Sequence, residues 1–148
     1  MAGAWEMTGD EIEILGHKDD LELFENPQRM ASFAIPGMNF QPVDVTRWVG
    51  DNETFEAFGR EVQVAHCPGH CPGNIVFHLP EEVRCFVGDV IFAGSVGRAD
   101  LPGGDFDVLE RSIRDKIYSL PDDTILHSGH GPDTTVGQEK ATNPFVRV

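Results

Sequence analysis

The sequence predicts one α/β or α+β domain in which short strands are mixed with a few helices. Three observations lead to this prediction. Stretches in which apolar and polar residues alternate, as they do in half-buried strands, recur between turns rich in Gly and Pro. A few other stretches carry apolar residues at helical spacing. The length of 148 residues is that of a single domain over 1–148, and it suffices for a sizeable core.

The first half of the chain is expected to hold short elements. Residues 19–25 are predicted to form a helix with Leu21 and Phe24 toward a core, and Pro27 bounds that helix. The other expected elements in this half are strands over 11–15 and 43–49, an irregular stretch over 31–42 and a turn over 50–53.

The second half is expected to hold most of the strands and the longest helix. Asp105 or Asp107 can cap a helix that runs to about Ser119. The apolar stripe of this helix consists of Val108, Leu109, Ile113 and Ile117. The remaining expected elements are strands over 61–65, 74–79, 83–87 and 124–127, a glycine-rich loop over 94–104 and a final helix over 135–142.

Composition and charge narrow the classes of function. The formal net charge is −14, with 11 Lys and Arg against 25 Asp and Glu. Binding to nucleic acid needs basic side chains that neutralise phosphates, so no nucleic-acid partner is expected, and the same balance disfavours anionic membranes. No apolar run approaches the roughly 20 residues of a membrane-spanning helix. This charge balance leaves small molecules, metals and proteins as partners, and a small-molecule substrate is expected. Three cysteines are too few and too odd in number for a disulfide framework, which favours a reducing, cytoplasmic setting.

Three places share one local design, in which a strand ends in a sharp turn that presents a side chain able to bind a metal. These places are Pro68-Gly69-His70, Val87-Gly88-Asp89 and Gly129-His130-Gly131. Glycine lets the backbone turn tightly and approach a ligand closely. Neutral histidine and carboxylate suit zinc, iron or manganese, and two His with one Asp leave positions open for water. Taken singly, such turns more often serve packing or chain reversal.

The residues alone also offer a second arrangement of metal ligands. His66, Cys67, His70 and Cys71 lie within six residues of one another and could form one structural zinc cluster. The intervening Pro and Gly residues, however, give an irregular turn rather than a ligand-presenting helix or knuckle. Cys67 and Cys71 are therefore expected to be small packing residues.

Several strings of the sequence follow the order of motifs in one known family. The turn His66–Gly73, with its doubled His-Cys-Pro-Gly, resembles the Pro-Gly-His-Thr-x-Gly turn of the metallo-β-lactamase superfamily. Residues Val87–Phe92 and Ser128–Pro132 resemble the Gly-Asp segment and the last His motif of that family. The loop Gly94–Asp100 resembles the Gly-Arg-Thr-Asp loop of the glyoxalase II-like branch, and Thr142–Phe145 also fits that branch.

This resemblance implies a fold, a metal site and an activity. The implied fold is an αββα sandwich, of which this chain would form the C-terminal half to two-thirds. In the family the two motif histidines bind metal and the motif Asp bridges two metals, so these roles fall on His70, His130 and the catalytic Asp89. The resemblance implies hydrolysis of thioesters or related acyl compounds through a metal-bound hydroxide, with one or two zinc ions, or with iron or manganese.

Two further residues are candidates for supporting roles. The Arg98 guanidinium is a bidentate donor that could bind a substrate carboxylate, and its alternative is an ion pair with Asp100 or Asp105. His66 is a candidate for a residue that orients a metal ligand without binding the metal itself, although a residue in this position more often packs at the end of a strand.

The sequence also departs from the family in one respect. The Thr-His-x-His-x-Asp-His signature, which supplies four ligands in the family, does not occur in the 148 residues. Met1–Ala4 resembles the apolar-Gly-Gly-Ala stretch that often follows that signature, so the chain is expected to begin just after it and to have impaired activity. An apolar sheet face left uncovered would favour a homo-oligomer. The alternatives are an iron-dependent enzyme similar to persulfide dioxygenases and a non-catalytic remnant.

Overall fold

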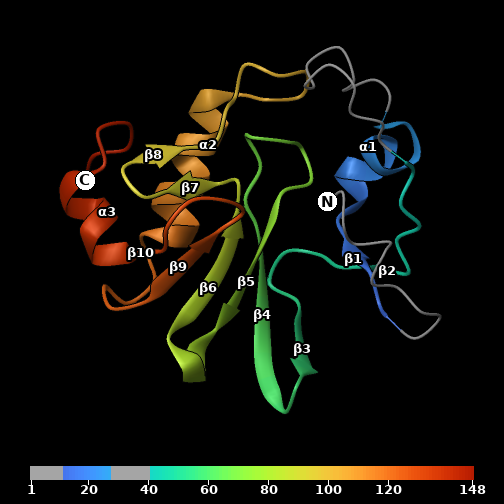
Figure 1. Cartoon of the computed structure of the whole chain (residues 1–148), viewed down its shortest axis with the longest axis horizontal. Helices are drawn as coiled ribbons and strands as arrows, with labels where there is room; N and C mark the ends of the chain where they lie inside the picture. The colour runs from blue at the N-terminus through green and yellow to red at the C-terminus, as the bar shows by residue number, and fades with distance from the viewer. Residues whose placement is uncertain (1–11, 28–40) are drawn as a thin grey trace. The chain divides into compact units, whose positions relative to one another are not determined.

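The computed structural model describes residues 12–27 and 41–148 (Figure 1). These residues form two compact units, one that ends at Val49 and one that begins at Gly50, and each unit is described by itself. The single domain expected over 1–148 stays a prediction. Within the two described ranges, no helix is both long enough and apolar enough to cross a membrane.

The described residues of the first unit form two very short strands and one α-helix. The helix expected over 19–25 is confirmed, but Leu21 is 42% exposed, so its predicted place in a core is wrong. Phe24 packs edge-on against Trp48 instead, with ring centroids 6.0 Å apart, because so short a helix turns only one narrow face toward the strands. The elements are β1 (Leu15–Gly16), the 3-10 turn η1 (Lys18–Asp20), α1 (Leu21–Glu25) and β2 (Arg47–Trp48), which pairs in parallel with β1.

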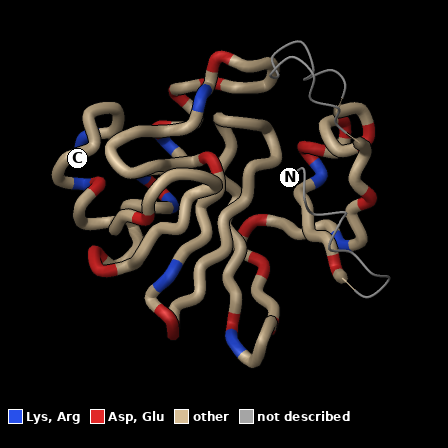
Figure 2. Tube along the Cα trace, in the orientation of Figure 1, with Lys and Arg blue, Asp and Glu red and all other residues tan. Residues whose placement is uncertain are grey.

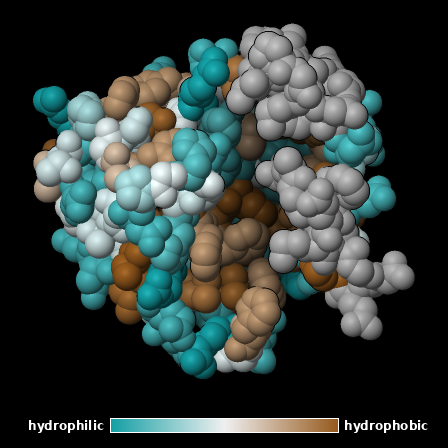
Figure 3. Space-filling model, in the orientation of Figure 1, coloured by the Kyte–Doolittle hydropathy of each residue, from teal (hydrophilic) through white to brown (hydrophobic). Residues whose placement is uncertain are grey.

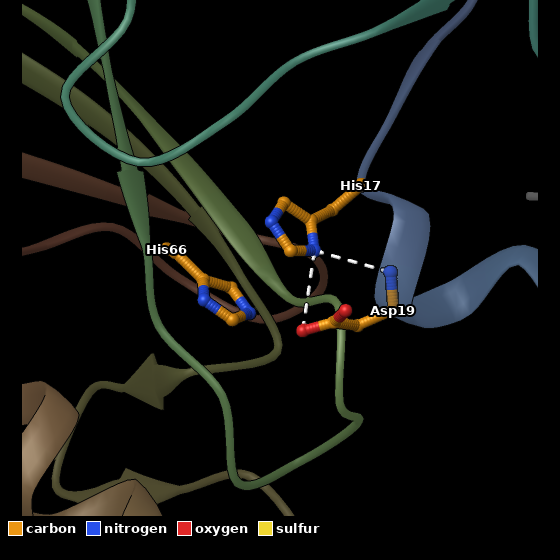
Figure 4. A group of neighbouring side chains, drawn as sticks. All are labelled: His17, Asp19 and His66. Carbon is orange, nitrogen blue, oxygen red and sulfur yellow. Dashed lines mark hydrogen bonds and ion pairs between the residues drawn. The ribbon is translucent and has the colours of Figure 1, made fainter.

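His17 caps the turn that leads into α1. Its Nδ1 accepts a hydrogen bond from the backbone N–H of Asp19 at 3.3 Å. The same nitrogen lies 3.7 Å from the Asp19 carboxylate, and Figure 4 shows these two side chains facing one another. The His17 ring thus caps the first turn by accepting from a backbone N–H.

The second unit is built on a six-stranded sheet with the order β10-β9-β6-β5-β4-β3. Neighbouring strands run antiparallel, except that β6 and β9 run parallel. The four strands predicted for this part of the chain are confirmed. The strands of the sheet are β3 (Thr54–Ala57), β4 (Arg60–His66), β5 (Ile75–Leu79), β6 (Arg84–Gly88), β9 (Ile125–Ser128) and β10 (Thr134–Thr135).

Two outer strands, β3 and β10, extend the sheet beyond the predicted strands. The chain enters β4 from β3 through Phe58 and Gly59, whose positive φ angles of 53° and 70° form a tight two-residue reversal. Strand β10 has two residues, too few for an alternating pattern. A separate hairpin of equally short strands, β7 (Ile91–Phe92) and β8 (Ser95–Val96), lies in the stretch after β6.

Capping side chains begin both helices of this unit, and the sequence predicts the first of these caps, at Asp105. The Asp105 carboxylate accepts a hydrogen bond from the Val108 N–H at 3.0 Å. The Thr135 hydroxyl accepts one from the Gln138 N–H at 3.2 Å. These bonds satisfy backbone donors in the first turn. The helical elements are α2 (Phe106–Ser112), its π-helical continuation η4 (Ile113–Ile117) and α3 (Val136–Thr142).

One face of the sheet packs against α2 and η4 and forms the hydrophobic core (Figure 1). Leu109, Ile113 and Ile117 of the predicted helical stripe are fully buried. The removal of these side chains from water stabilises the packing of the helix on the sheet. The sheet residues in this cluster are Val76, Cys85, Val87 and Leu126.

The opposite face of the sheet carries aromatic side chains. Phe77 pairs across the strands with Val64 on one side and Phe86 on the other, and Phe55 packs edge-on against Phe77 at 6.3 Å. Phe86 is 48% exposed, and Figure 3 shows apolar side chains over β4, β5 and β6. A face of this kind supports the expectation of self-association, which stays a prediction.

Asp51 joins three segments of the second unit. Its carboxylate accepts hydrogen bonds from Lys116 Nζ at 2.8 and 3.0 Å and from the His66 N–H at 2.9 Å. Burial raises the pKa of this carboxyl, but the bonds from Lys116 and His66 outweigh burial and lower the pKa below its ordinary value of 3.8. The ionised form is therefore the one that the fold stabilises.

We expect Ile113→Ala to lower the free energy of unfolding by about 2–5 kcal/mol, because it leaves a cavity in the core between helix and sheet. Asp115→Ala in the same helical turn is the matched control, since this side chain is exposed and its loss should change stability by less than about 0.5 kcal/mol. Urea unfolding followed by circular dichroism measures both values. Equal losses for the two variants would contradict the packing described here.

We expect Asp51 to stabilise the fold near neutral pH and to lose this effect in acid. Its pKa is lowered on folding, so its contribution is complete above about 3.8 and disappears as the pH falls through the lower folded value. The contribution should be at most about 1 kcal/mol, because water screens this partly exposed ion pair. Unfolding of Asp51→Asn and the wild type should therefore differ at pH 7 and converge toward pH 2.

Candidate metal centre

The three predicted metal ligands follow strands that end at the same edge of the sheet. His70 lies in the turn after β4, Asp89 directly follows β6, and His130 follows β9. Strand β9 runs parallel to β6. Strand β4 runs in the same direction as β6, because β4 and β6 are each antiparallel to β5, which lies between them. The topology therefore brings the three turns to one edge.

The structure places the three side chains beside one another. His70 Nε2 lies 3.7 Å from Asp89 Oδ2, and His130 Nε2 lies 3.9 Å from Asp89 Oδ1. The two histidines thus approach different oxygens of one carboxylate. Their role as metal ligands stays a prediction.

A hydrogen bond fixes the tautomer of His70. Its Nδ1 lies 2.8 Å from the carbonyl oxygen of Arg98, which can only accept, so Nδ1 carries the proton. The lone pair is then on Nε2, the nitrogen directed toward Asp89. Metal-binding histidines in proteins commonly have this backing, which orients the ring and raises its basicity. The donor set therefore fits a metal ion.

His130 is oriented by stacking. Its side chain is 74% exposed, and its ring lies 4.4 Å from that of Phe92 at an interplanar angle of 25°. Phe92 belongs to the two-residue strand β7, which is too short for a recognisable pattern, so its contact with His130 could not be predicted from the sequence. An exposed ring held on one side by an aromatic face keeps its nitrogens accessible.

Two glycines allow the backbone to approach Asp89 closely. A methyl group on Gly129 would collide with Asp89 Oδ1, and one on Gly97 would collide with the Asp89 carbonyl oxygen. The sequence predicts that a glycine beside His130 allows a close approach of the backbone. The close approach at Gly97 is visible only from its contact with Asp89 in the structure. A larger side chain at Gly129 would displace the carboxylate that the two histidines approach, and one at Gly97 would displace the backbone of Asp89.

A cavity of about 400 Å³ opens at this edge. His70, Asp89, Phe92, Arg98 and His130 contribute to its lining. It combines apolar and charged walls, as small-molecule sites do.

Arg98 lines the cavity and also forms an ion pair within this chain. Its guanidinium donates two hydrogen bonds to Asp100, at 3.0 and 2.9 Å, and both side chains are more than half exposed. The pair raises the pKa of Arg98 and lowers that of Asp100. The ion pair that the sequence offers as an alternative is thus present, and the substrate-binding role stays a prediction.

His66 and the cysteines do not gather around His70. His66 Nε2 lies 2.7 Å from the Pro72 carbonyl oxygen, a contact that braces the turn carrying His70. Cys67 is fully buried in the core, and burial raises its pKa to about 12, whereas a zinc ligand must be a thiolate. Cys71 Sγ lies 3.6 Å from Asn74 Oδ1. The structure supports the packing role of both cysteines over the local zinc cluster.

The distribution of charge follows the composition. In the part of the chain that Figure 2 describes, basic residues are scattered singly among the more numerous acidic ones. The expectation that nucleic acid is not a partner stays a prediction.

The chain is similar to known metal-dependent proteins. The family model described as metallo-beta-lactamase superfamily matches residues 3–130. The hydroxyacylglutathione hydrolase GloC of Haemophilus influenzae is 42% identical over 139 residues, which cover 91% of this chain and 64% of that protein.

Two solved structures share the fold. The crystal structure of BLEG-1 B3 metallo-beta-lactamase has a TM-score of 0.84 and 36% identity, over 91% of this chain and 65% of that one. The crystal structure of TTHA1623 in a di-iron-bound form has a TM-score of 0.76 and 41% identity, over 93% of this chain and 66% of that one. The chain thus spans just under two-thirds of the length of each of these proteins. The match to the family model covers most of the residues and includes all three side chains at the sheet edge. With this fold and these motifs, the chain belongs to the metallo-beta-lactamase superfamily.

Proposed function

We propose that this protein is a metal-dependent hydrolase of the glyoxalase II-like type that acts on thioesters or related acyl compounds. The observation that carries the proposal is the Asp89 carboxylate, whose two oxygens face the Nε2 atoms of His70 and His130 beside a cavity. The similarity to a hydroxyacylglutathione hydrolase over most of this chain supports the hydrolase class.

In this proposal His70, Asp89 and His130 would hold the metal, with a different oxygen of Asp89 facing each histidine. Imidazole and carboxylate donors suit zinc, and the di-iron form of a similar protein supports iron as a second candidate. Such an ion would supply an acidified water and would polarise the acyl carbonyl. The three free cysteines support a reducing, cytoplasmic setting.

The residues of the cavity wall would bind and orient the substrate. Phe92 offers an apolar surface beside His130 for the acyl group. Arg98 could release Asp100 and bind a substrate carboxylate with the same two donors, because this ion pair is exposed and weakly held.

We expect His130→Ala to weaken zinc binding at least tenfold, because it removes one of the proposed ligands. Isothermal titration calorimetry of the full chain with Zn²⁺ measures the dissociation constant. His127→Ala is the matched control, since this histidine pairs with Arg84 and Asp133 instead. Binding should also weaken in acid, where histidine is protonated. Loss on Cys67→Ser, with His130→Ala harmless, would favour the local cluster and contradict this site.

We expect residues 1–148 alone to hydrolyse S-lactoylglutathione very slowly, because they contain only three of the expected donors. Joining a Thr-His-x-His-x-Asp-His segment with its preceding strands ahead of Met1 should restore zinc-dependent hydrolysis, and Asp89→Ala should abolish it again. Thioester cleavage is followed by absorbance. Oxygen consumption with glutathione persulfide, without any thioesterase activity, would replace the hydrolase by the dioxygenase alternative.

A further inference from the structure

Glu139 is a carboxylate that the structure buries completely, at 0% exposure, in helix α3. Three donors satisfy it. Oε1 accepts from the Thr134 hydroxyl at 2.5 Å, and Oε2 accepts from the Gly94 N–H at 3.0 Å and from Asn143 Nδ2 at 2.8 Å. A charged group is costly to bury, and full satisfaction of this kind is what makes burial tolerable.

The Oε2 side of Glu139 holds the hairpin β7–β8. Gly94 is in the turn of this hairpin, directly before β8. Asn143 adds a second link, because its Nδ2 also donates to the carbonyl oxygen of Ser95 at 3.1 Å. Each strand of the hairpin has two residues, and such a short pair is marginal without tertiary support. Helix α3 therefore supplies anchoring that the hairpin lacks.

The same hairpin supports both histidines of the candidate centre. Phe92, at the end of β7, stacks on His130. Arg98, two residues after β8, receives the hydrogen bond that fixes His70. The two strands of the hairpin are also joined where they leave it, because the Gly97 N–H donates to the Val90 carbonyl oxygen at 3.2 Å. A displacement of the segment that carries Phe92 therefore also moves the segment that carries Arg98.

We propose that Glu139, assisted by Asn143, is a positioning residue for the metal centre. Its hydrogen bonds go to Thr134, Gly94 and Asn143 and not to the three candidate ligands. It holds the β7–β8 hairpin in the register that places the Arg98 carbonyl against His70 and the Phe92 ring against His130. The metal part of this proposal rests on the proposed function, whereas the effect on His70 does not.

The chain offers a control that separates positioning from general stability. Thr134→Val removes the donor to Oε1 and leaves both bonds of Oε2 to the hairpin side in place. Glu139→Leu removes all three bonds at similar volume. Glu139→Gln is the conservative variant, because its amide oxygen can keep the bonds to Gly94 and Asn143 while its NH2 group donates to Thr134.

The first measurement is made on the metal-free full chain at pH 8. Long-range ¹H–¹⁵N correlations of the His70 ring report which nitrogen carries the proton. We expect the Nδ1–H form in the wild type, Thr134→Val and Glu139→Gln, and a shift toward Nε2–H in Glu139→Leu. Retention of the Nδ1–H form in Glu139→Leu overturns the proposal, and so does an equal shift in Thr134→Val. If Glu139→Leu does not fold, Asn143→Ala, which cuts the link to Ser95, decides by the same criterion.

The second measurement is the affinity for Zn²⁺ by calorimetry. We expect Glu139→Leu to bind about tenfold more weakly than the wild type, with Thr134→Val and Glu139→Gln unchanged, as for other residues that orient ligands indirectly. Unchanged affinity in Glu139→Leu overturns the metal part. Absence of binding in the wild type, together with the shift of the His70 proton in Glu139→Leu, refutes the proposed function while supporting the positioning of His70.

Discussion

The direction of the strands is the constraint on which the candidate centre depends. Strands β4, β6 and β9 run the same way because β6 and β9 pair in parallel and β5 reverses between β4 and β6. Each strand delivers one polar side chain at its end, so the three converge on one edge. An antiparallel pairing of β6 with β9 would send His130 to the opposite end of the sheet. The parallel pair is therefore the feature of the core that makes the site.

Convergence is not sufficient, because each histidine also needs an orientation. The β7–β8 hairpin and the residues that follow it orient both histidines. The Arg98 carbonyl oxygen accepts a hydrogen bond from His70, and the Phe92 ring stacks on His130. Buried Glu139 ties that hairpin to α3. Helix α3 is thus linked to the exposed histidines through hydrogen bonds that are buried between Glu139 and Asn143, part-buried at Gly94 and exposed at His70. The buried bond matters because a hydrogen bond loses little to competing water in a buried position.

Much of the fold follows from local patterns, and the failures have physical causes. The long helix was predictable because Asp105 caps it and its stripe has helical spacing. Strands β7 and β10 were not, since two residues carry no period. The strand predicted over 43–49 shrinks to β2, and the core place predicted for Leu21 is wrong, because both depend on neighbours that a local pattern does not contain. Such elements exist by tertiary pairing alone.

The sequence by itself determined the identity and order of the chemical groups. The turns that present His70, Asp89 and His130 can be predicted from the sequence, because Gly and Pro favour chain reversals through their own backbone geometry. Only the tertiary structure decided which oxygen of Asp89 each histidine approaches, which His70 nitrogen carries the proton, and that Cys67 belongs to the core. These properties depend on contacts between residues far apart in the chain. Distances and partners of that kind arise from packing, which no local spacing encodes.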